Sequence, residues 1–256
     1  MIRKTEPIII AHRGESYDAP ENTLASINLA WQRNDDAVEI DIHLTKDNRI
    51  VVIHDPNTKR ITGQNKKIKN STLTELQTLD FGSWKAEKWK DEKISTIDEV
   101  LQTVPVNKKI IIEIKSGKNI LPFLKKAIDN SPLEIKQIEF ISFEYSTIVA
   151  TKKMFPNHIA LYLIDLDYTW YTKLFSPSVN NLIKKVKKGN LDGLNVWAGK
   201  LLTKQFADKV KLAGLLLYVW TVDDPEHAKQ LFDWGIDALT TNRAEWMQHQ
   251  LFDDNK

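Results

Sequence analysis

The chain contains no cysteine among its 256 residues, so neither disulfide bonds nor thiolate metal sites contribute to its structure. Proline and glycine are scarce, with nine of each, and no stretch rich in them divides the chain. A strong charge of one sign is missing too, because 36 basic residues stand against 34 acidic ones. We therefore expect no nucleic-acid partner and a single domain over residues 1–256.

Long apolar runs are also missing. The first residues are basic, but the apolar run behind them stops at His12, so the beginning lacks the form of a secretion signal. The longest apolar-rich stretch, residues 212–222, is too short to span a bilayer. We expect no transmembrane segment and a cytoplasmic location, and the sequence leaves the oligomeric state open.

Eight short apolar runs recur along the chain, and segments with helical periodicity separate most of them. Strands that are buried on both faces of a parallel sheet have this continuous hydrophobic character. Eight strand–helix units in about 250 residues predict an α/β fold, a TIM-type (β/α)8 barrel. The expected strands cover residues 8–11, 37–42, 110–114, 138–142, 159–163, 191–196, 215–222 and 236–240.

One segment breaks this rhythm after the second expected strand. A turn at residues 46–48 and the run RIVVIHD predict a hairpin onto that strand, and about forty mostly polar residues follow. We interpret approximately residues 56–95 as a small inserted subdomain over one end of the barrel. Such an insertion commonly shapes a substrate pocket.

Three carboxylates stand near the ends of two expected strands: Glu39 and Asp41 on the second, and Glu113 on the third. Residues two apart on a strand share a face, and the carboxyl ends of barrel strands open at one mouth. Three buried acids repel one another unless they take up protons or bind a cation. Oxygen ligands suit Mg²⁺ or Ca²⁺ and do not distinguish the two. A structural ion-pair network is the alternative.

Histidines and basic residues are expected at the same mouth. His12 ends the first strand and the hairpin delivers His54, so both imidazoles can carry protons there near neutral pH, although either alone could be a core residue. Arg13 and Lys115 suit an anionic substrate, and Trp220, at a later strand end, suits a pocket wall. A metal, two proton carriers and two cations together indicate chemistry on a phosphate ester.

Five motifs follow one another in an order that resembles the signature of the glycerophosphodiester phosphodiesterases. The resemblance runs over nearly the whole chain. The motifs are His12-Arg13-Gly14, Pro20-Glu21-Asn22-Thr23, Glu39-x-Asp41, Thr45-Lys46-Asp47 leading to His54-Asp55, and Glu113-x-Lys115.

This resemblance implies a TIM-type barrel that hydrolyses small phosphodiesters such as glycerophosphocholine or glycerophosphoethanolamine to sn-glycerol 3-phosphate and an alcohol. It implies a metal held by Glu39, Asp41 and Glu113. It further implies that His12 and His54 act as general acid and base and that Arg13 and Lys115 contact the phosphate. The alternatives are a lysophospholipase D or a sphingomyelinase D-like enzyme, and a non-catalytic barrel that binds phosphodiesters.

Two positions depart from the family pattern. The last expected strand is followed by Thr241-Asn242-Arg243-Ala244 where the family often has Thr-Asp-Arg-Pro, and Ser95 replaces a usual proline. We expect both departures to lie away from the catalytic residues. Elsewhere, Asn22 is expected to cap the first helix, and His43 is expected to lie beyond the metal although it shares the strand face of Asp41.

Overall fold

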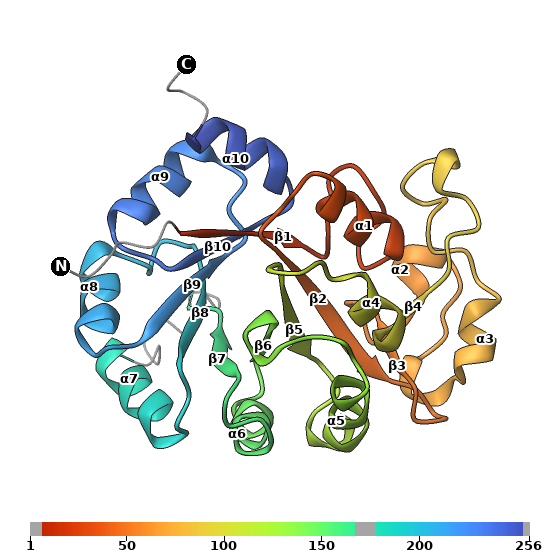
Figure 1. Cartoon of the computed structure of the whole chain (residues 1–256), viewed down its shortest axis with the longest axis horizontal. Coiled ribbons are helices and arrows are strands. Elements are labelled where there is room, and N and C mark those ends of the chain that lie inside the picture. Colours follow the sequence, from red (N-terminus) through yellow and green to blue (C-terminus); the bar gives the residue numbers. More distant parts are fainter. Residues whose placement is uncertain (1–6, 167–177, 253–256) are drawn as a thin grey trace.

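The computed structural model describes residues 7–166 and 178–252, so the basic start of the chain lies outside the described residues. Each of eight strands pairs in parallel with the next, and the last pairs with the first, which closes a barrel (Figure 1). All eight predicted strands are present, and the TIM-type fold is confirmed. The strands are β1 (Ile8–His12), β2 (Ala37–Leu44), β5 (Lys109–Ile114), β6 (Ile138–Ser142), β7 (Ile159–Ile164), β8 (Gly193–Trp197), β9 (Leu216–Trp220) and β10 (Ala238–Thr241).

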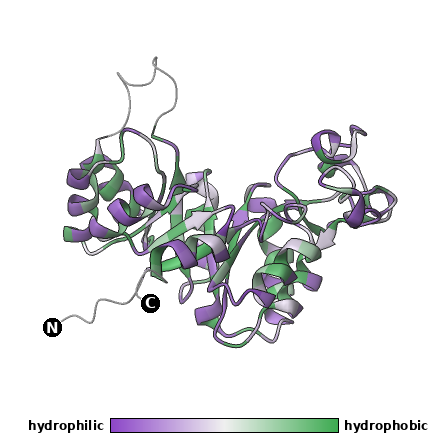
Figure 2. Cartoon of the chain, turned by 90° about the horizontal axis from the view of Figure 1, so that it is seen from above, coloured by the Kyte–Doolittle hydropathy of each residue, from purple (hydrophilic) through white to green (hydrophobic). Residues whose placement is uncertain are grey.

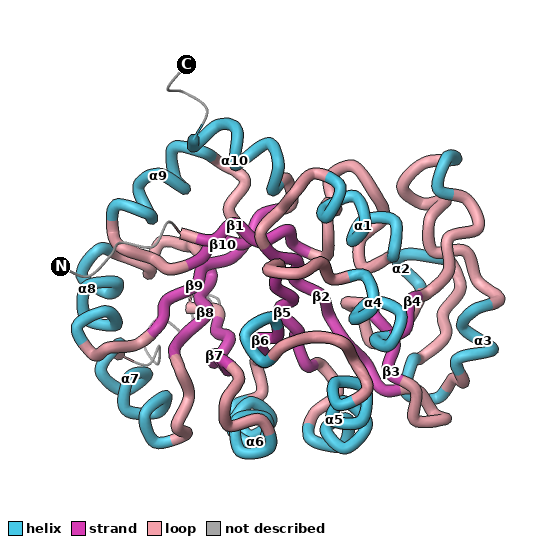
Figure 3. Tube along the Cα trace, in the orientation of Figure 1, coloured by secondary structure: helices cyan, strands magenta, loops and turns pink. Residues whose placement is uncertain are grey.

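Helices surround the strands (Figure 3). Their first residues include types that favour helix starts, as in α9, which has Asp224 as its N-cap and Pro225 in its first turn. Within the described ranges, no helix has both the length and the hydrophobicity to cross a membrane. The outer helices are α1 (Leu24–Gln32), α4 (Ile97–Thr103), α5 (Leu121–Asp129), α6 (Tyr145–Met154), α7 (Val179–Lys188), α8 (Lys204–Leu212), α9 (Pro225–Asp233) and α10 (Ala244–Phe252).

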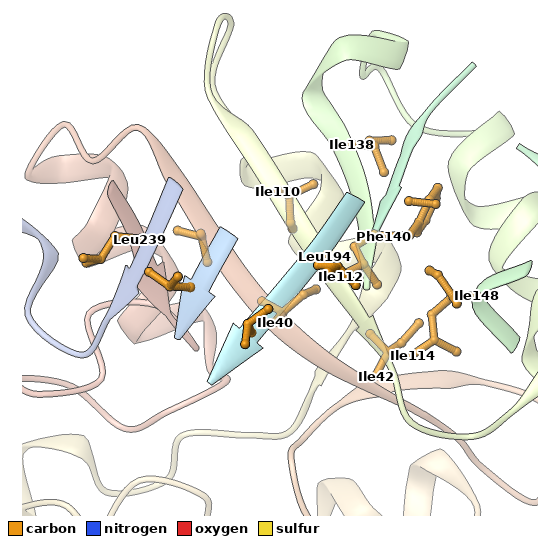
Figure 4. Close-up of a cluster of buried hydrophobic side chains, with 14 of the residues drawn as sticks. Ile40, Ile42, Ile110, Ile112, Ile114, Ile138, Phe140, Ile148, Leu194 and Leu239 are labelled. Carbon is orange, nitrogen blue, oxygen red and sulfur yellow. The ribbon is translucent and has the colours of Figure 1, made fainter. Parts of the chain in front are cut away.

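Strand alternation divides the core into two layers. Ile40 and Ile42 of β2 and Ile112 of β5 belong to the larger layer, between barrel and helices (Figure 4). Side chains of the other parity, including Ile10 and Ile111, fill the barrel itself. The strands are accordingly largely apolar, while the helices carry both polar and apolar residues (Figure 2). Inward-facing positions near the carboxyl ends of the strands are therefore open to the mouth of the barrel, together with the loops that follow them.

A segment between β3 (Ile50–Val52) and β4 (Ser95–Thr96) lies beside β2. The hairpin is present as predicted, because β3 pairs antiparallel with β2 and β4 pairs antiparallel with β3. Residues 53–94, here called the inserted segment, contribute to a small apolar cluster of their own that includes Ile68, Leu76 and Phe81. Its short helices are α2 (Lys59–Thr62), η1 (Ile68–Asn70), α3 (Leu73–Gln77) and η2 (Glu87–Trp89), and the barrel adds η3 (Lys118–Ile120) and η4 (Ile135–Gln137).

Candidate active site

Three carboxylates meet inside the mouth of the barrel. Glu39 and Asp41 point inward from β2, and the strand register places Asp41 directly beside Glu113 of β5. One oxygen from each carboxylate lies within 4.8 Å of the others, and all three residues are buried. The structure thus brings together the three acids that the strand alternation predicted.

Asp41 is the best satisfied of the three acids. Lys115 Nζ lies 3.1 Å from its Oδ1, and Arg13 Nε lies 3.2 Å from its Oδ2. Asn22 adds two hydrogen bonds, because its Nδ2 donates to Asp41 Oδ2 and its Oδ1 accepts from the Asp41 backbone N–H. The expectation that Asn22 caps α1 is wrong: the cap is Thr23, and the positive φ of Asn22 belongs to a turn that aims its amide at the acids instead.

Glu39 and Glu113 keep buried oxygens without a well-aligned donor. Within the described residues, Oε1 of Glu39 has no hydrogen-bond partner, and Oε1 of Glu113 has only the ammonium group of Lys115, as an ion pair at 2.7 Å. Burial and the Asp41 carboxylate raise the pKa of both glutamates, that of Glu113 to about 8. Burial opposes ionisation of Asp41 as well, but Lys115 and Arg13 hold its pKa below its usual range. This charge imbalance and the hard oxygen donors fit a divalent cation.

The turn behind β1 positions Arg13. Both Arg13 and Gly14 have positive φ, 58° and 80°. A Cβ at Gly14 would lie 2.6 Å from backbone and side-chain atoms of Ser26. Glycine is therefore required there, because only glycine combines this φ with so close an approach. The Arg13 backbone N–H then donates to Glu39 Oε2 at 3.2 Å.

His12 is held by a side chain from the last strand's end. Its Nδ1 lies 2.7 Å from Asn242 Oδ1, and its Nε2 lies 3.9 Å from Glu39 Oε2. Burial and the nearby Arg13 lower the pKa of His12 to about 4. The expectation that the departure at residues 241–244 lies away from the predicted catalytic residues is wrong. β10 pairs with β1, and Thr241 lies beside Ala11. The residues that follow these two, Asn242 and His12, are therefore neighbours.

His54 has a carboxylate partner. Its Nδ1 lies 2.7 Å from Asp55 Oδ1, and Arg60 Nε donates to the other oxygen of Asp55 at 2.8 Å. Arg60 also binds Glu21, and Glu21 binds Arg13 at 2.8 Å. A chain of ion pairs therefore connects Arg13, a predicted phosphate contact, with His54, a predicted proton carrier. Asp55 belongs to one of the sequence motifs, but no role was predicted for it. Arg60 was not predicted, because its contact with Asp55 depends on how α2 packs.

His43 lies outside the acid cluster, consistent with the expectation for it. Its Nε2 lies 3.1 Å from the backbone oxygen of His54, and its Nδ1 lies 3.3 Å from Ser116 Oγ. His43 therefore supports the backbone that carries His54. Ser95, the second departure, does lie apart from these groups, with its hydroxyl accepting from the Leu24 backbone at the start of α1.

Aromatic rings form the wall of the mouth opposite β2. Trp220 meets Phe143 and Trp197 edge to face, with ring centres 5.6 and 5.1 Å apart. Lys115 Nζ lies 5.8 Å from the centre of the Phe143 ring, which joins this wall to the acid cluster. Trp220 Nε1 is buried and has no hydrogen-bond partner in the parts of the chain that are described. The sequence predicted Trp220 but not Trp197, which stands at the matching end of the neighbouring strand.

Comparisons with known proteins identify relatives of this chain. Residues 12–246 match the model of the glycerophosphoryl diester phosphodiesterase family. The chain is 31% identical to a glycerophosphodiester phosphodiesterase of Caldanaerobacter subterraneus subsp. tengcongensis, over 93% of this chain and 95% of that protein. It is 27% identical to a lysophospholipase D of Homo sapiens, over 91% and 82%. A phosphodiesterase structure from Oleispira antarctica, in complex with the product sn-glycerol-3-phosphate, superposes with a TM-score of 0.85 at 27% identity, covering 96% of each chain.

Proposed function

Because the chain belongs to the glycerophosphoryl diester phosphodiesterase family, we propose that it uses a divalent cation to hydrolyse glycerophosphodiesters to sn-glycerol 3-phosphate and an alcohol. The observation that carries this proposal is the meeting of three buried carboxylates with two imidazoles and two cationic side chains at one mouth, where His54 lies close enough to Asp41 to contribute to lowering its pKa. Glycerophosphocholine and glycerophosphoethanolamine are the first substrates to test.

We assign the cation site to Glu39, Asp41 and Glu113. When bound there, Mg²⁺ or Ca²⁺ supplies positive charge that neutralises the non-bridging phosphate oxygens. The raised pKa values of the two glutamates and the unpartnered Oε1 of Glu39 support this assignment. The choice between the two ions follows from metal titration.

The remaining side chains bind different parts of the substrate. Arg13 and Lys115 contact the phosphate, because their cationic groups already flank Asp41 at the mouth. Trp220 packs against the glycerol carbons through the face of its ring.

His12 and His54 transfer the protons. Each has its Nδ1 occupied by an oxygen, which leaves Nε2 for the substrate. Burial and the nearby Arg13 lower the pKa of His12 to about 4, so His12 is unprotonated at neutral pH, as a base requires. We therefore assign His54 as the acid that protonates the leaving alkoxide as the P–O bond breaks, and His12 as the base that deprotonates the nucleophile.

The nucleophile is either water or the glycerol hydroxyl next to the phosphate ester. Attack by that hydroxyl forms a 1,2-cyclic phosphate and releases the alcohol, and water then opens the ring. Phosphorus NMR of the reaction mixture distinguishes the two routes, because only the second passes through a cyclic phosphate.

The test is turnover of glycerophosphocholine by His12→Ala and His54→Ala with Mg²⁺ or Ca²⁺ present. Each variant should lose roughly 10²–10⁴-fold in kcat, since general acid–base catalysis contributes about that much. His227→Ala, which removes an imidazole of α9 that does not belong to the acid cluster, is the matched control. A nearly normal rate in either of the first two variants, with normal thermal unfolding, would remove the assignment.

The same assay addresses the alternatives. A chelator should abolish wild-type turnover, whereas metal-independent turnover would contradict the cation site. Faster hydrolysis of lysophosphatidylcholine than of glycerophosphocholine would favour a lysophospholipase D, and phosphodiester binding without turnover would favour a non-catalytic barrel.

The cytoplasmic location stays a prediction, which cell fractionation tests.

A further inference from the structure

A cavity of about 720 Å³ opens beside the acid cluster, between the inserted segment and the loop that follows β5. Lys115 belongs to both the cavity and the acid cluster, so the two are continuous. A volume in this range is typical of small-molecule sites. On the inserted-segment side the lining includes Pro56, Asn57 and residues 67–69, and on the other side it includes Ser116, Gly117, Asn119 and Glu144.

The charge of this lining is strongly positive. Four lysines line the cavity, here called the lysine pocket, against one glutamate. Because Lys115 is already paired with Asp41 and Glu113, the three other lysines and the one glutamate leave an excess of two positive charges. Glu144 is the single acid, and hydroxyl groups of Ser146 and Thr147 already donate to its carboxylate. The lysines are Lys46, Lys67, Lys69 and Lys115.

Three of these lysines are solvent-exposed and are not held by a carboxylate. Lys46, Lys67 and Lys69 make no ion pair within 4.0 Å with any described residue. They come from two different segments, the turn after β2 and the inserted segment, yet line one hollow. Like charges gathered around one hollow raise the local concentration of ions of opposite charge, most strongly at low ionic strength.

The lysine pocket also lies on one particular side of the predicted phosphate position. The aromatic wall of Trp197 and Trp220 is built on β8 and β9, across the barrel from β2 and the inserted segment. Lys115 stands between the two, 5.8 Å from the ring centre of Phe143 and in the lining of the pocket. A diester whose phosphate contacts Lys115 and whose glycerol packs on the aromatic wall would extend its alcohol half into the lysine pocket.

We propose that the lysine pocket is the subsite for the alcohol half of the substrate and that it selects head groups with an additional negative charge, such as a second phosphate. This inference rests on the proposed function and specifies its substrate class. A head group with a quaternary ammonium, as in glycerophosphocholine, meets repulsion in the same pocket. The enzyme therefore prefers polyanionic glycerophosphodiesters to cationic ones.

The first measurement compares glycerophosphoinositol with glycerophosphoinositol 4-phosphate, which differ by one phosphate on the same ring. At low ionic strength kcat/KM should favour the phosphorylated substrate about tenfold or more, corresponding to about 1.4 kcal/mol. The ratio should fall toward one in 0.5 M salt, since solvent-exposed charges are screened over a few ångströms at that ionic strength. Equal kcat/KM values at low salt would overturn the inference.

The second measurement uses the double substitution Lys67→Met and Lys69→Met, which should reduce the substrate ratio at least threefold. The matched control is Lys153→Met with Lys187→Met on α6 and α7, which removes the same charge outside the pocket and should keep the ratio. An unchanged ratio in the pocket variant, or an equal loss in the control, would contradict the subsite. Thermal unfolding confirms that the variants are folded.

The two levels of proposal fail in different ways. If wild-type protein hydrolyses neither inositol diester nor glycerophosphocholine with Mg²⁺ or Ca²⁺, the proposed function is wrong and the subsite assignment falls with it. If it hydrolyses all three without preference for the phosphorylated head group, only the subsite assignment is wrong.

Discussion

The hydrogen bond between His12 and Asn242 fixes which imidazole nitrogen faces the mouth. Asn242 also donates from Nδ2 to Asp223 Oδ2 and from its backbone to Asp223 Oδ1, at 2.7 and 2.8 Å. With Nδ2 engaged in this way, Oδ1 is presented to His12, and the ring nitrogen that meets it carries the proton. Nε2 is then the unprotonated nitrogen, as a base requires. Asn242 is thus a positioning residue, although it departs from the usual family residue.

Replacing Asn242 by alanine should lower kcat about tenfold to a hundredfold with little change in KM. Losing the acceptor leaves the buried Nδ1–H unsatisfied, which costs about 1–3 kcal/mol and frees the ring to adopt other orientations. Steady-state kinetics on glycerophosphocholine measure the split between the two parameters. A kcat equal to that of the wild type would show that His12 needs no such partner.

The variant Asn242→Asp separates orientation from charge. It keeps an acceptor for His12 but sets a second carboxylate beside Asp223, and negative charge raises the pKa of an imidazole. The pKa of His12 should rise from its low value of about 4. The acidic limb of kcat/KM, on which His12 loses its proton, should therefore move to higher pH. An unmoved limb would show that this limb does not report His12.

At the scale of elements, buried acids join the loop after β1 to the end of α1 and the start of α10. Glu15 accepts from the Glu245 backbone at 2.8 Å, and Arg33 binds both Glu15 and Glu245. Asp35 is fully buried, and its oxygens lack a donor among the residues described. Burial and the neighbouring Glu15 raise the pKa of Asp35 to about 9. A proton on Asp35 therefore helps these three elements to pack at neutral pH.

We expect the stability of the wild type to decrease with pH because of this carboxyl. A raised pKa means that the folded chain holds the proton more tightly, so its stabilising effect is complete below the unfolded pKa of 3.8 and is lost as pH rises through about 9. The Asp35→Asn variant cannot ionise at this position. Its free energy of unfolding, relative to that of the wild type, should therefore rise by about 1–3 kcal/mol between pH 5 and pH 9. Urea unfolding at both pH values measures the difference. If the free energy of unfolding changed by the same amount in both proteins between the two pH values, the role assigned to Asp35 would be wrong.

At the scale of the whole molecule, closure of the barrel gathers like charges that a chain would otherwise keep apart. Glu39 and Asp41 come from β2 and Glu113 from β5, and the first and the last of these acids lie 74 positions apart in the sequence. Apolar packing on both faces of the barrel wall holds these strands in place regardless of the electrostatic cost at the mouth. A cation that relieves this cost therefore stabilises the entire fold.

Excess Mg²⁺ or Ca²⁺ should raise the melting temperature. At a hundred times the Kd the gain is about 2.7 kcal/mol, which is roughly 5–10 °C for a chain of this size. Protons compete with the cation because the pKa of Glu113 is about 8 and that of Glu39 is also raised. The shift should therefore be larger at pH 8.5 than at pH 6.5, as calorimetry measures.

The control for this prediction is the double substitution Glu39→Gln and Glu113→Gln. It retains the shape of both side chains, removes the repulsion, and should abolish the response to either ion. A rise in melting temperature that persists in this variant would place the cation elsewhere.

Local patterns in the sequence were sufficient to predict the barrel and the position of the three acids at the centre of the site. Continuous apolar runs predicted all eight strands, and the two-residue spacing of Glu39 and Asp41 predicted a shared inward face. These predictions succeed because strand alternation and burial depend on neighbours within a few residues.

The contacts that position the site were decided by the tertiary structure. Asn22 reaches Asp41 through a turn of positive φ, Asn242 reaches His12 because the last strand pairs with the first, and Arg60 reaches Asp55 through the packing of α2. Side-chain hydrogen bonds need their atoms to meet within about 3 Å. No local periodicity sets the distance between residues 12 and 242, so that contact exists only once the ring of strands has closed.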